Sequence, residues 1–320
     1  MTGIVLDVRD LHTHFTLRRG VLKAVDGVSF TLRKGEVLGL VGESGCGKSL
    51  TALSIMRLLP RGGARTVGGE IWLNGENLLT KTKREMRAIR GRSISMILQD
   101  PQTSLNPVFT VGEQLREAIG GRGAAVVRAA IAALRRVDIA APEQRIGQYP
   151  HQMSGGMKQR VVGAIAMSGQ PGVLIADEPT TALDVTIQLQ YLKLLQRLRH
   201  EHQMAILFIT HDFGVVARMC DRVAVMYAGR IVETGTVRDV FDHPSHPYTQ
   251  ALIASVPKMA GPTGRLHTIE GQPPSLLDLP VGCRFAARCP HAEQRCRDAY
   301  PDSFAAGPDH TADCWRLAAA

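Results

Sequence analysis

A glycine-rich run at residues 42–49, Gly-Glu-Ser-Gly-Cys-Gly-Lys-Ser, contains the residue types that can bind the phosphates of a nucleotide. Glycines let backbone N–H groups converge on phosphate oxygens, and a helix that begins there adds positive potential. Lys48 would contact the β- and γ-phosphates, and the Ser49 hydroxyl would ligate Mg²⁺. The other expected phosphate-binding positions are Gly42, Ser44, Gly45, Cys46 and Gly47. The run therefore predicts a phosphate-binding loop.

Two adjacent carboxylates, Asp177 and Glu178, follow the apolar segment 173–176. At the carboxyl edge of a sheet, Asp177 can hold Mg²⁺ through water, and Glu178 can orient and deprotonate the attacking water. Strand ends of this kind are common, and two ordinary solvated carboxylates are the default interpretation of the pair alone. Because a phosphate-binding loop precedes them, the two motifs together predict a nucleoside triphosphatase.

The segments around both motifs predict an α/β fold with a mainly parallel sheet. The apolar run 37–41 comes directly before the glycine-rich loop, and residues 49–59 have helical spacing. Strand, glycine-rich loop and helix are the expected context for phosphate binding. Farther along, a predicted helix at about 185–202 alternates with apolar strands. These strands are predicted at residues 173–176, 205–210 and 223–227.

Other parts of the chain have a different character. Residues 5–11, 25–32 and 69–74 indicate β structure with tight turns. Residues 111–140 have a helical composition that is rich in Ala and Leu. From His243 onward, prolines mark an irregular, linker-like region. These prolines are Pro244, Pro247, Pro257, Pro262, Pro273, Pro274 and Pro280.

The composition suits a soluble globular protein. A chain of 320 residues with 44% hydrophobic and 5% aromatic residues can bury a sizeable core. The most apolar run, 161–176, is interrupted by glycine and proline, and residues 1–15 lack the apolar core of a secretion signal. We therefore expect a cytosolic protein whose membrane role comes through partner subunits. The formal charge of +9 comes from scattered Lys and Arg residues, so we expect no nucleic-acid partner.

The run Ser154-Gly155-Gly156, followed by Met-Lys-Gln-Arg, specifies the class of nucleotide-binding protein. A hydroxyl and bare glycine amides at the start of a helix form a second anion site, although a capped helix start is the alternative for the tripeptide alone. The run resembles the signature of ABC ATPases, and the order of phosphate loop, glutamine, signature, Asp-Glu strand and histidine matches that family. In the family, the signature closes over ATP on a partner subunit, so the resemblance implies a dimer.

The same resemblance implies roles for four further residues. Gln99 would sense Mg²⁺ and the attacking water, and it would lie where the ATPase meets membrane subunits. His211 would contact the γ-phosphate. Asp184, in the pair Leu183-Asp184, would communicate between paired sites, with a helix N-cap as the structural alternative. Phe15 would stack on adenine, or it would belong to the core.

Three longer runs and the C-terminus resemble the dipeptide and oligopeptide permease ATPases. The runs are residues 99–107, 149–157 and 246–252, and the C-terminal match extends from the segment 282–290 to Trp315. The resemblance implies an ATPase that energises the uptake of di- or oligopeptides. Importers of other small solutes, such as nickel or glutathione, share much of this pattern and are the alternative.

This branch of the family also implies partners and a location. A second, homologous ABC ATPase would form a heterodimer with the chain, alongside two transmembrane permease subunits and an extracytoplasmic peptide-binding protein. The chain would lie peripherally on the cytoplasmic face of the inner membrane. A soluble ABC protein that acts on ribosomes or DNA is the rival from another class. Such proteins usually carry two ATPase units or long coiled coils, and the sequence contains neither.

Four cysteines near the C-terminus, Cys283, Cys289, Cys296 and Cys314, are separated by five, six and seventeen residues. In a reducing cytosol, this clustering favours a metal or redox site over disulfides. Four thiolates can ligate a [4Fe–4S] cluster or a tetrahedral zinc ion. Zinc sites favour close pairs of ligands, which are absent here, and the resemblance to the peptide permeases also favours the cluster.

The expected architecture is therefore an α/β P-loop NTPase core of the ABC type over residues 1–240. It contains an antiparallel β subdomain near the N-terminus and a helical subdomain, at about residues 101–156, that carries the signature. A small, irregular extension with the cysteine cluster follows at residues 241–320. The expected cofactors are ATP, Mg²⁺ and the [4Fe–4S] cluster.

Overall fold

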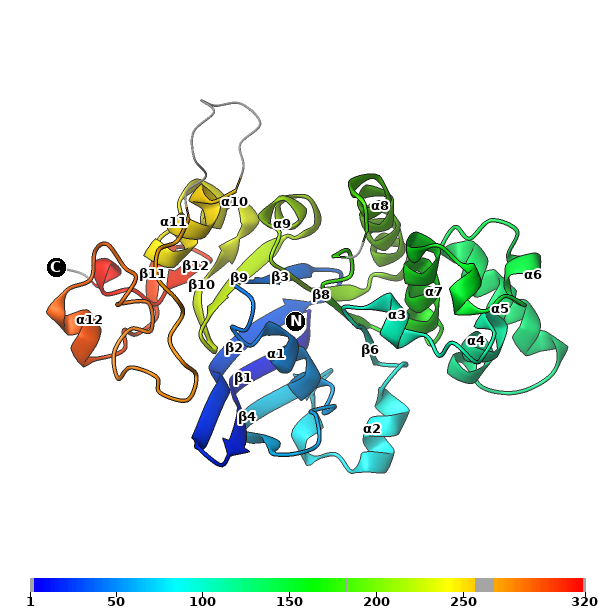
Figure 1. Ribbon diagram of the computed structural model, residues 1–320, viewed down its shortest axis with the longest axis horizontal. Coiled ribbons are helices and arrows are strands. Elements are labelled where there is room, and N and C mark those ends of the chain that lie inside the picture. Colours follow the sequence, from blue (N-terminus) through cyan, green and yellow to red (C-terminus); the bar gives the residue numbers. More distant parts are fainter. Residues whose placement is uncertain (1–2, 182, 257–267, 319–320) are drawn as a thin grey trace. The chain divides into compact units, whose positions relative to one another are not determined.

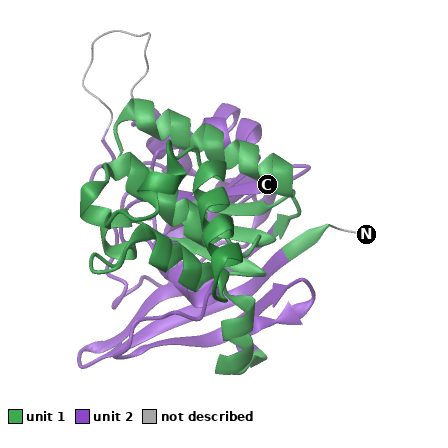
Figure 2. Ribbon diagram, turned by 90° about the vertical axis from the view of Figure 1, so that its right-hand side faces the viewer, with its two compact units in different colours: residues 1–5, 32–36, 80–208 green, residues 6–31, 37–79, 209–320 purple. Residues whose placement is uncertain are grey.

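The computed structural model describes residues 3–181, 183–256 and 268–318 (Figure 1). The chain divides into two compact units, and each combines segments that are far apart in the sequence (Figure 2). Unit 1 contains residues 1–5, 32–36 and 80–208, and unit 2 contains residues 6–31, 37–79 and 209–320. Two of the predicted linker prolines, Pro257 and Pro262, lie outside the described residues. In the described part of the chain, no helix is long and apolar enough to cross a membrane.

An antiparallel sheet accounts for most of the N-terminal part of unit 2 (Figure 1). Leu6, Val8 and Leu11 are buried along its first strand, whereas Arg9 and Asp10 between them are exposed. This pattern is typical of a strand with one covered face. The strands, in the spatial order β2-β1-β4-β5, are β1 (Ile4–Leu17), β2 (Gly20–Arg33), β4 (Ala64–Leu73) and β5 (Glu76–Asn77).

A second sheet in unit 2 includes the strand that precedes the glycine-rich loop. This strand, β3 (Val37–Val41), pairs in parallel with β9 (Arg222–Tyr227). β9 pairs in antiparallel fashion with β10 (Arg230–Thr236). β10 pairs with β12 (His310–Ala312), which pairs with β11 (Phe304–Gly307). The C-terminal region, predicted to be irregular, thus adds two strands to the sheet that contains β3.

One hydrophobic core joins the C-terminal region to β9 within unit 2. Tyr227 of β9 lies 4.5 Å from Tyr248 and 5.3 Å from Phe285 between ring centroids. All three side chains are at most 1% exposed, so they contribute fully to the hydrophobic stabilisation of the unit. The boundary predicted near residue 240 therefore lies inside one compact unit. The helices of unit 2 are α1 (Lys48–Ile55), α9 (Phe213–Met219), α10 (Val237–Asp242), α11 (Pro247–Ala254) and α12 (Gln294–Asp298).

Unit 1 contains parallel strands and most of the helices. β6 (Ile94–Ile97) pairs in parallel with β7 (Val173–Asp177), and the other neighbour of β7 is β8 (Ala205–Thr210). β7 and β8 are buried along their whole length, as expected for parallel strands that are covered on both faces. The helices are α2 (Lys83–Ile89), α3 (Pro101–Ser104), α4 (Val111–Ile119), α5 (Ala124–Arg136), α6 (Pro142–Arg145), α7 (Gly155–Met167) and α8 (Val185–His202). Short 3₁₀ helices lie at Leu78–Thr80, Pro150–Gln152 and Trp315–Leu317.

Residues 111–140, predicted to be helical, form two helices rather than one. The structure divides it into α4 and α5, with a break at residues 120–123. Gly120 and Gly123 have φ angles of 78° and 92°, which are readily adopted only by glycine. Gly120 ends one helix and Gly123 precedes the next, so the helix is interrupted where the sequence composition alone indicates continuity.

Candidate functional site

The glycine-rich loop joins β3 to α1, which is the predicted order of strand, loop and helix. Gly47 has a φ angle of 110°, and a Cβ atom there would collide with the carbonyl oxygen of Ala24. A Cβ atom on Gly42 would collide with the carbonyl oxygen of Met226. Both positions therefore require glycine, because the loop is packed closely against neighbouring backbone. Ser44 and Gly45, in contrast, are exposed at the tip of the loop.

Lys48 is buried beneath this loop and is only 5% exposed. Its Nζ atom donates hydrogen bonds to the carbonyl oxygens of Gly42, at 2.8 Å, and Glu43, at 3.0 Å. The cost of burying an ammonium group is offset by these acceptors. Cys46 is also buried, and burial raises the pKa of its thiol. Burial therefore disfavours its thiolate, the reactive form of cysteine.

In unit 1, the carboxyl ends of β6 and β7 bring two predicted residues together. Gln99 Nε2 donates to Glu178 Oε2 at 3.0 Å, although 79 residues separate them in the sequence. Thr181 Oγ1 donates to the same oxygen at 3.0 Å. Glu178 has a φ angle of 45°, a strained conformation that costs about 1–3 kcal/mol and is concentrated at functional sites. The neighbouring Asp177 is only 4% exposed. The structure thus presents Glu178 as a carboxylate oriented by two donors.

The signature run begins helix α7. Ser154 is the N-cap residue, and its Oγ atom accepts a hydrogen bond from the N–H of Met157 at 3.4 Å. Gly156 faces Ile187 of α8 so closely that a Cβ atom would collide with that side chain. Ser154 and Gly155 are exposed. The exposed start of a long helix, with a hydroxyl and bare amides, has the chemistry of an anion site.

Three other predicted residues lie at element ends or on a strand. Asp184 is the N-cap of α8, because its Oδ1 atom accepts from the N–H of Ile187 at 3.0 Å. His211 follows β8 and is exposed. Phe15 is half-buried on β1 opposite Ala64, and it is not part of the buried core. Unit 2 contains Phe15, the glycine-rich loop and His211, and unit 1 contains Gln99, Ser154, Gly155, Gly156, Asp177, Glu178 and Asp184.

The four C-terminal cysteines converge on one pocket in unit 2, where Phe285 and Trp315 also contribute to the lining. The cysteines are half-buried, and burial raises the pKa of Cys283 to about 11. All four belong to the described residues, and no three of their sulfur atoms lie within 4.8 Å of one another. In a tetrahedral zinc site with Zn–S bonds of about 2.3 Å, the sulfurs would be about 4 Å apart. The four thiols therefore offer donors for a metal centre, and a zinc ion would require their sulfurs to lie closer together.

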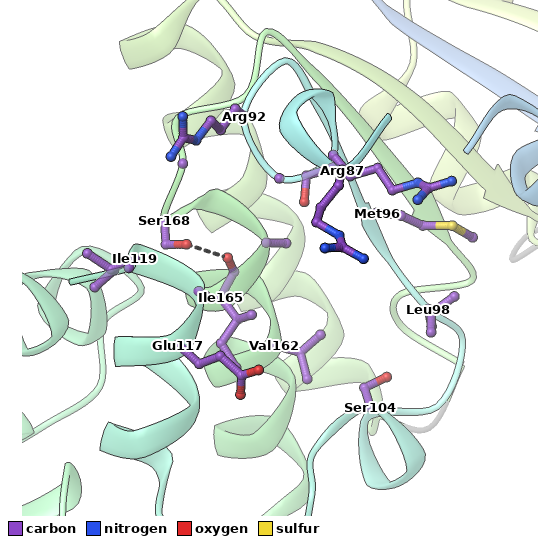
Figure 3. A pocket seen from close by; sticks show the side chains of 17 residues that line it. Arg87, Arg92, Met96, Leu98, Ser104, Glu117, Ile119, Val162, Ile165 and Ser168 are labelled. Atoms are coloured by element: carbon purple, nitrogen blue, oxygen red, sulfur yellow. Dashed lines mark hydrogen bonds between the residues drawn. The ribbon is translucent and has the colours of Figure 1, made fainter. Parts of the chain in front are cut away.

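A pocket of about 510 Å³ lies in unit 1 and was not foreseen from the sequence (Figure 3). Arg87 and Arg92 line it together with apolar side chains such as Met96 and Leu98. Leu98 immediately precedes Gln99 and is 44% exposed. A basic and partly apolar surface therefore adjoins the residue that contacts Glu178.

Two family models match the sequence. Residues 25–181 match the ABC transporter family, and residues 232–296 match the oligopeptide/dipeptide transporter C-terminal region. A probable peptide ABC transporter ATP-binding protein of Sinorhizobium fredii is 54% identical over 98% of this chain and 95% of its own length. The chain belongs to the ABC transporter ATP-binding proteins. This ABC protein is an ATPase, as the sequence analysis predicts.

Other relatives agree with this family membership. The dipeptide transport ATP-binding protein DppD of Bacillus subtilis is 49% identical, over 97% of this ABC protein and 94% of the relative. The oligopeptide transport ATP-binding protein OppD of Salmonella typhimurium is 48% identical, over 95% and 92%. Among solved structures, the dimeric bacterial ABC transporter cassette MJ0796 is 26% identical, with a TM-score of 0.64. The match covers 73% of this ABC protein and 99% of that chain, and it confirms the expected P-loop fold.

Proposed function

We propose that this ABC ATPase energises the uptake of di- or oligopeptides. The observation that carries the proposal is the similarity of residues 232–296 to a region named for oligopeptide and dipeptide transporters. The three relatives described above carry peptide, dipeptide or oligopeptide in their names and align with at least 95% of the chain. Importers of nickel or glutathione are the alternative, because the ATPase motifs do not depend on the solute.

Uptake by the complete transporter tests this proposal. The chain would be expressed with its permease subunits, its second ATPase and its binding protein, and membrane vesicles would be supplied with labelled peptides. We expect ATP-dependent accumulation of a dipeptide or a longer peptide. Accumulation of nickel or glutathione without any peptide uptake would assign the transporter to the alternative branch.

We further propose a role in ATP binding or hydrolysis for each of the predicted residues. Lys48 binds the β- and γ-phosphates, and Ser49, Gln99 and Asp177 bind Mg²⁺ directly or through water. Glu178 takes a proton from the attacking water. The orientation of its carboxylate by Gln99 and Thr181 supports this role, because a general base must be aimed at the proton that it removes. His211 contacts the γ-phosphate, and Phe15 stacks on the adenine.

The exposed signature supports a dimer in the proposal. Ser154, Gly155 and Gly156 would bind the γ-phosphate of ATP held by a second, homologous ATPase, and Asp184 would lie near the shared boundary. Two transmembrane permease subunits and an extracytoplasmic peptide-binding protein complete the transporter. The chain would then be peripheral on the cytoplasmic face of the inner membrane.

The pocket beside Gln99 is the proposed docking site for a permease subunit. Three arginines, Arg87, Arg90 and Arg92, outweigh Glu117 and give it positive charge, and apolar side chains such as Leu98 and Met96 supply an apolar surface. A short cytoplasmic helix of the permease with acidic and apolar side chains fits this chemistry. Val108 and Phe109 of the same unit are 70% and 47% exposed.

Reversal of charge at this pocket tests the docking site. We expect Arg87→Glu, and more strongly the Arg87→Glu and Arg92→Glu double variant, to reduce co-purification with the permease subunits. Arg84→Glu is the matched control, because Arg84 lies on the same helix and does not line the pocket. ATP binding by the isolated chain should be equal in all variants. Normal assembly of the double variant would contradict the assignment.

We also propose that Cys283, Cys289, Cys296 and Cys314 hold a [4Fe–4S] cluster. Their convergence on one pocket supports a shared metal centre, and the absence of close ligand pairs in their sequence spacing favours the cluster over zinc. When bound, the cluster would cross-link segments that are distant in the sequence and could exchange one electron. The thiolates of this chain would supply the ligands, and the surrounding Phe285 and Trp315 would limit access of water.

Metal analysis of anaerobically purified protein tests the cluster. We expect about four irons and four sulfides per chain with broad visible absorption, and a loss of both in Cys289→Ser. Cys220→Ser is the control, because Cys220 does not line the pocket. One zinc ion per chain without iron would refute the cluster while leaving the ATPase assignment intact.

A further inference from the structure

The cysteine-containing segment also contacts the phosphate-binding loop through Arg288. Its Nη1 and Nη2 atoms donate to Glu43 Oε2 at 2.8 Å and to Glu43 Oε1 at 3.0 Å. Glu43 is the second residue of the glycine-rich loop. The Arg288 side chain is only 4% exposed and the Glu43 side chain 27% exposed, so this two-point ion pair is partly shielded from water and from salt.

The remaining donors of Arg288 are fixed by the C-terminal region and by β9. Its Nε atom donates to the carbonyl oxygen of Glu270 at 3.0 Å, and its Nη1 atom donates to Tyr227 Oη at 3.3 Å. The guanidinium carbon lies 5.8 Å from the ring centroid of Phe285. Only a planar, forked group can make these contacts together with the ion pair, so lysine cannot replace it.

The backbone of Glu43 is also held by a residue of the C-terminal region. Its N–H donates to Tyr248 Oη at 2.9 Å, and Tyr248 is fully buried. The carbonyl oxygen of Glu43 accepts from Lys48 Nζ at 3.0 Å. Contacts therefore run from Arg288 and Tyr248 through Glu43 to the lysine of the loop. Pro273, Pro274 and Leu276 of the C-terminal region line a small cavity together with residues 43–46 of the loop.

A second arginine attaches the turn that contains Arg288 to other parts of unit 2. Arg284 lies four residues before Arg288, and its guanidinium is bonded to the Asp26 carboxylate and the Ala228 carbonyl oxygen. The turn between Cys283 and Cys289 is closed by hydrogen bonds such as that from the Arg288 N–H to the carbonyl of Phe285, at 2.9 Å. Both arginines thus project from one short, hydrogen-bonded turn towards the strands and the loop of unit 2.

We propose that Arg288 and Tyr248 are positioning residues for ATP binding. They hold Glu43, and through it the loop and Lys48, in the conformation that receives the phosphates. The C-terminal region therefore belongs to the nucleotide site of this ATPase. This role depends on ATP binding by the loop, and it holds whichever solute is transported and whichever metal the cysteines bind.

A double-mutant cycle on the full chain tests the proposal. The Glu178→Gln background prevents turnover, and the measured quantity is the Kd for MgATP at equilibrium. We expect Arg288→Ala and Glu43→Gln each to raise Kd about tenfold, which is the size of a shielded, charge-assisted pair. The double variant should be no weaker than the worse single variant, because both changes remove one interaction.

Controls separate positioning from general loss of structure. Arg297→Ala removes an exposed arginine of the same region and should leave Kd unchanged. Arg288→Lys keeps the charge and should still raise Kd, and it carries the test if Arg288→Ala does not fold. In the assembled transporter without the Glu178→Gln change, Arg288→Lys should raise KM for ATP with little change in kcat. Folded variants with the Kd of the Arg297→Ala control, or strictly additive effects on the free energy of binding, would overturn the proposal.

Discussion

Glu178→Gln will retain ATP binding and lose most ATP hydrolysis, with a fall in kcat of about 10²- to 10⁴-fold, the usual contribution of a general base. Glutamine has nearly the same shape, and its carbonyl oxygen can still accept from Gln99 and Thr181. It cannot take a proton from water. Phosphate release by the assembled transporter and equilibrium binding of MgATP measure the two properties separately.

The control for this experiment is Glu201→Gln, which changes an exposed glutamate of helix α8 in the same unit. Its kcat and Kd should equal those of the unaltered protein. If Glu178→Gln hydrolyses ATP at the normal rate, Glu178 is not the base. A loss of both binding and hydrolysis would instead mean that this carboxylate serves mainly to shape the nucleotide site.

Lys48→Met is expected to weaken ATP binding about a hundredfold and to abolish hydrolysis at ordinary ATP concentrations. The ammonium group makes charge-assisted hydrogen bonds to the phosphates in the proposed complex, and methionine keeps the length of the side chain without any donor. Equilibrium titration with MgATP measures the effect. Lys193→Met, which changes an exposed lysine on α8, is the matched control.

The fold should survive this substitution. Lys48 is buried, and its ammonium bonds only compensate for the cost of burying its charge. Replacement by a neutral side chain of similar volume removes both the cost of burying the charge and the hydrogen bonds that offset this cost. The midpoint of thermal unfolding should therefore change little. An unchanged Kd in a folded Lys48→Met protein would show that the loop binds phosphate through its backbone alone.

Motifs that are local in the sequence were predictable. The glycine-rich loop is a continuous run, and its position between a buried strand and a helix follows from hydrophobic periodicity. The contact of Gln99 with Glu178 is long-range, but both residues follow strands, and the ends of parallel strands meet at one edge of a sheet. The convergence of the four cysteines was likewise foreseeable, because several thiols close together in a cytosolic chain are typical of a shared metal site.

Contacts that depend on three-dimensional packing were not predictable. Arg288 and Glu43 are 245 residues apart, and neither has a distinctive neighbourhood in the sequence. The hydroxyl of Thr181, which donates to Glu178, has no role that the sequence alone predicts. Strands β11 and β12 are short and lack a clear alternation, so the proline-rich composition around them indicated irregular chain.

Because β12 pairs with β10, removal of the C-terminal region would disrupt the sheet of unit 2. Glu233 of β10 is completely buried, and its carboxylate accepts from the N–H groups of Ser245, at 2.7 Å, and His246, at 3.0 Å. His310 of β12 places its Nε2 atom 2.7 Å from the same carboxylate. Each of these three partners of the buried charge comes from beyond residue 240.

The solved cassette MJ0796 matches over 99% of its own length but only 73% of this chain, so a version of this protein shortened after residue 240 is a design to consider. Removal of the residues beyond 240 would leave the Glu233 carboxylate without these donors. It would also expose the edge of β10 and the ring of Tyr227. The segment beyond residue 240 is therefore not an independent domain that can be removed while the rest of unit 2 keeps its packing. For cloning, labelling or domain exchange, the smallest intact piece of this ATPase includes its C-terminal strands.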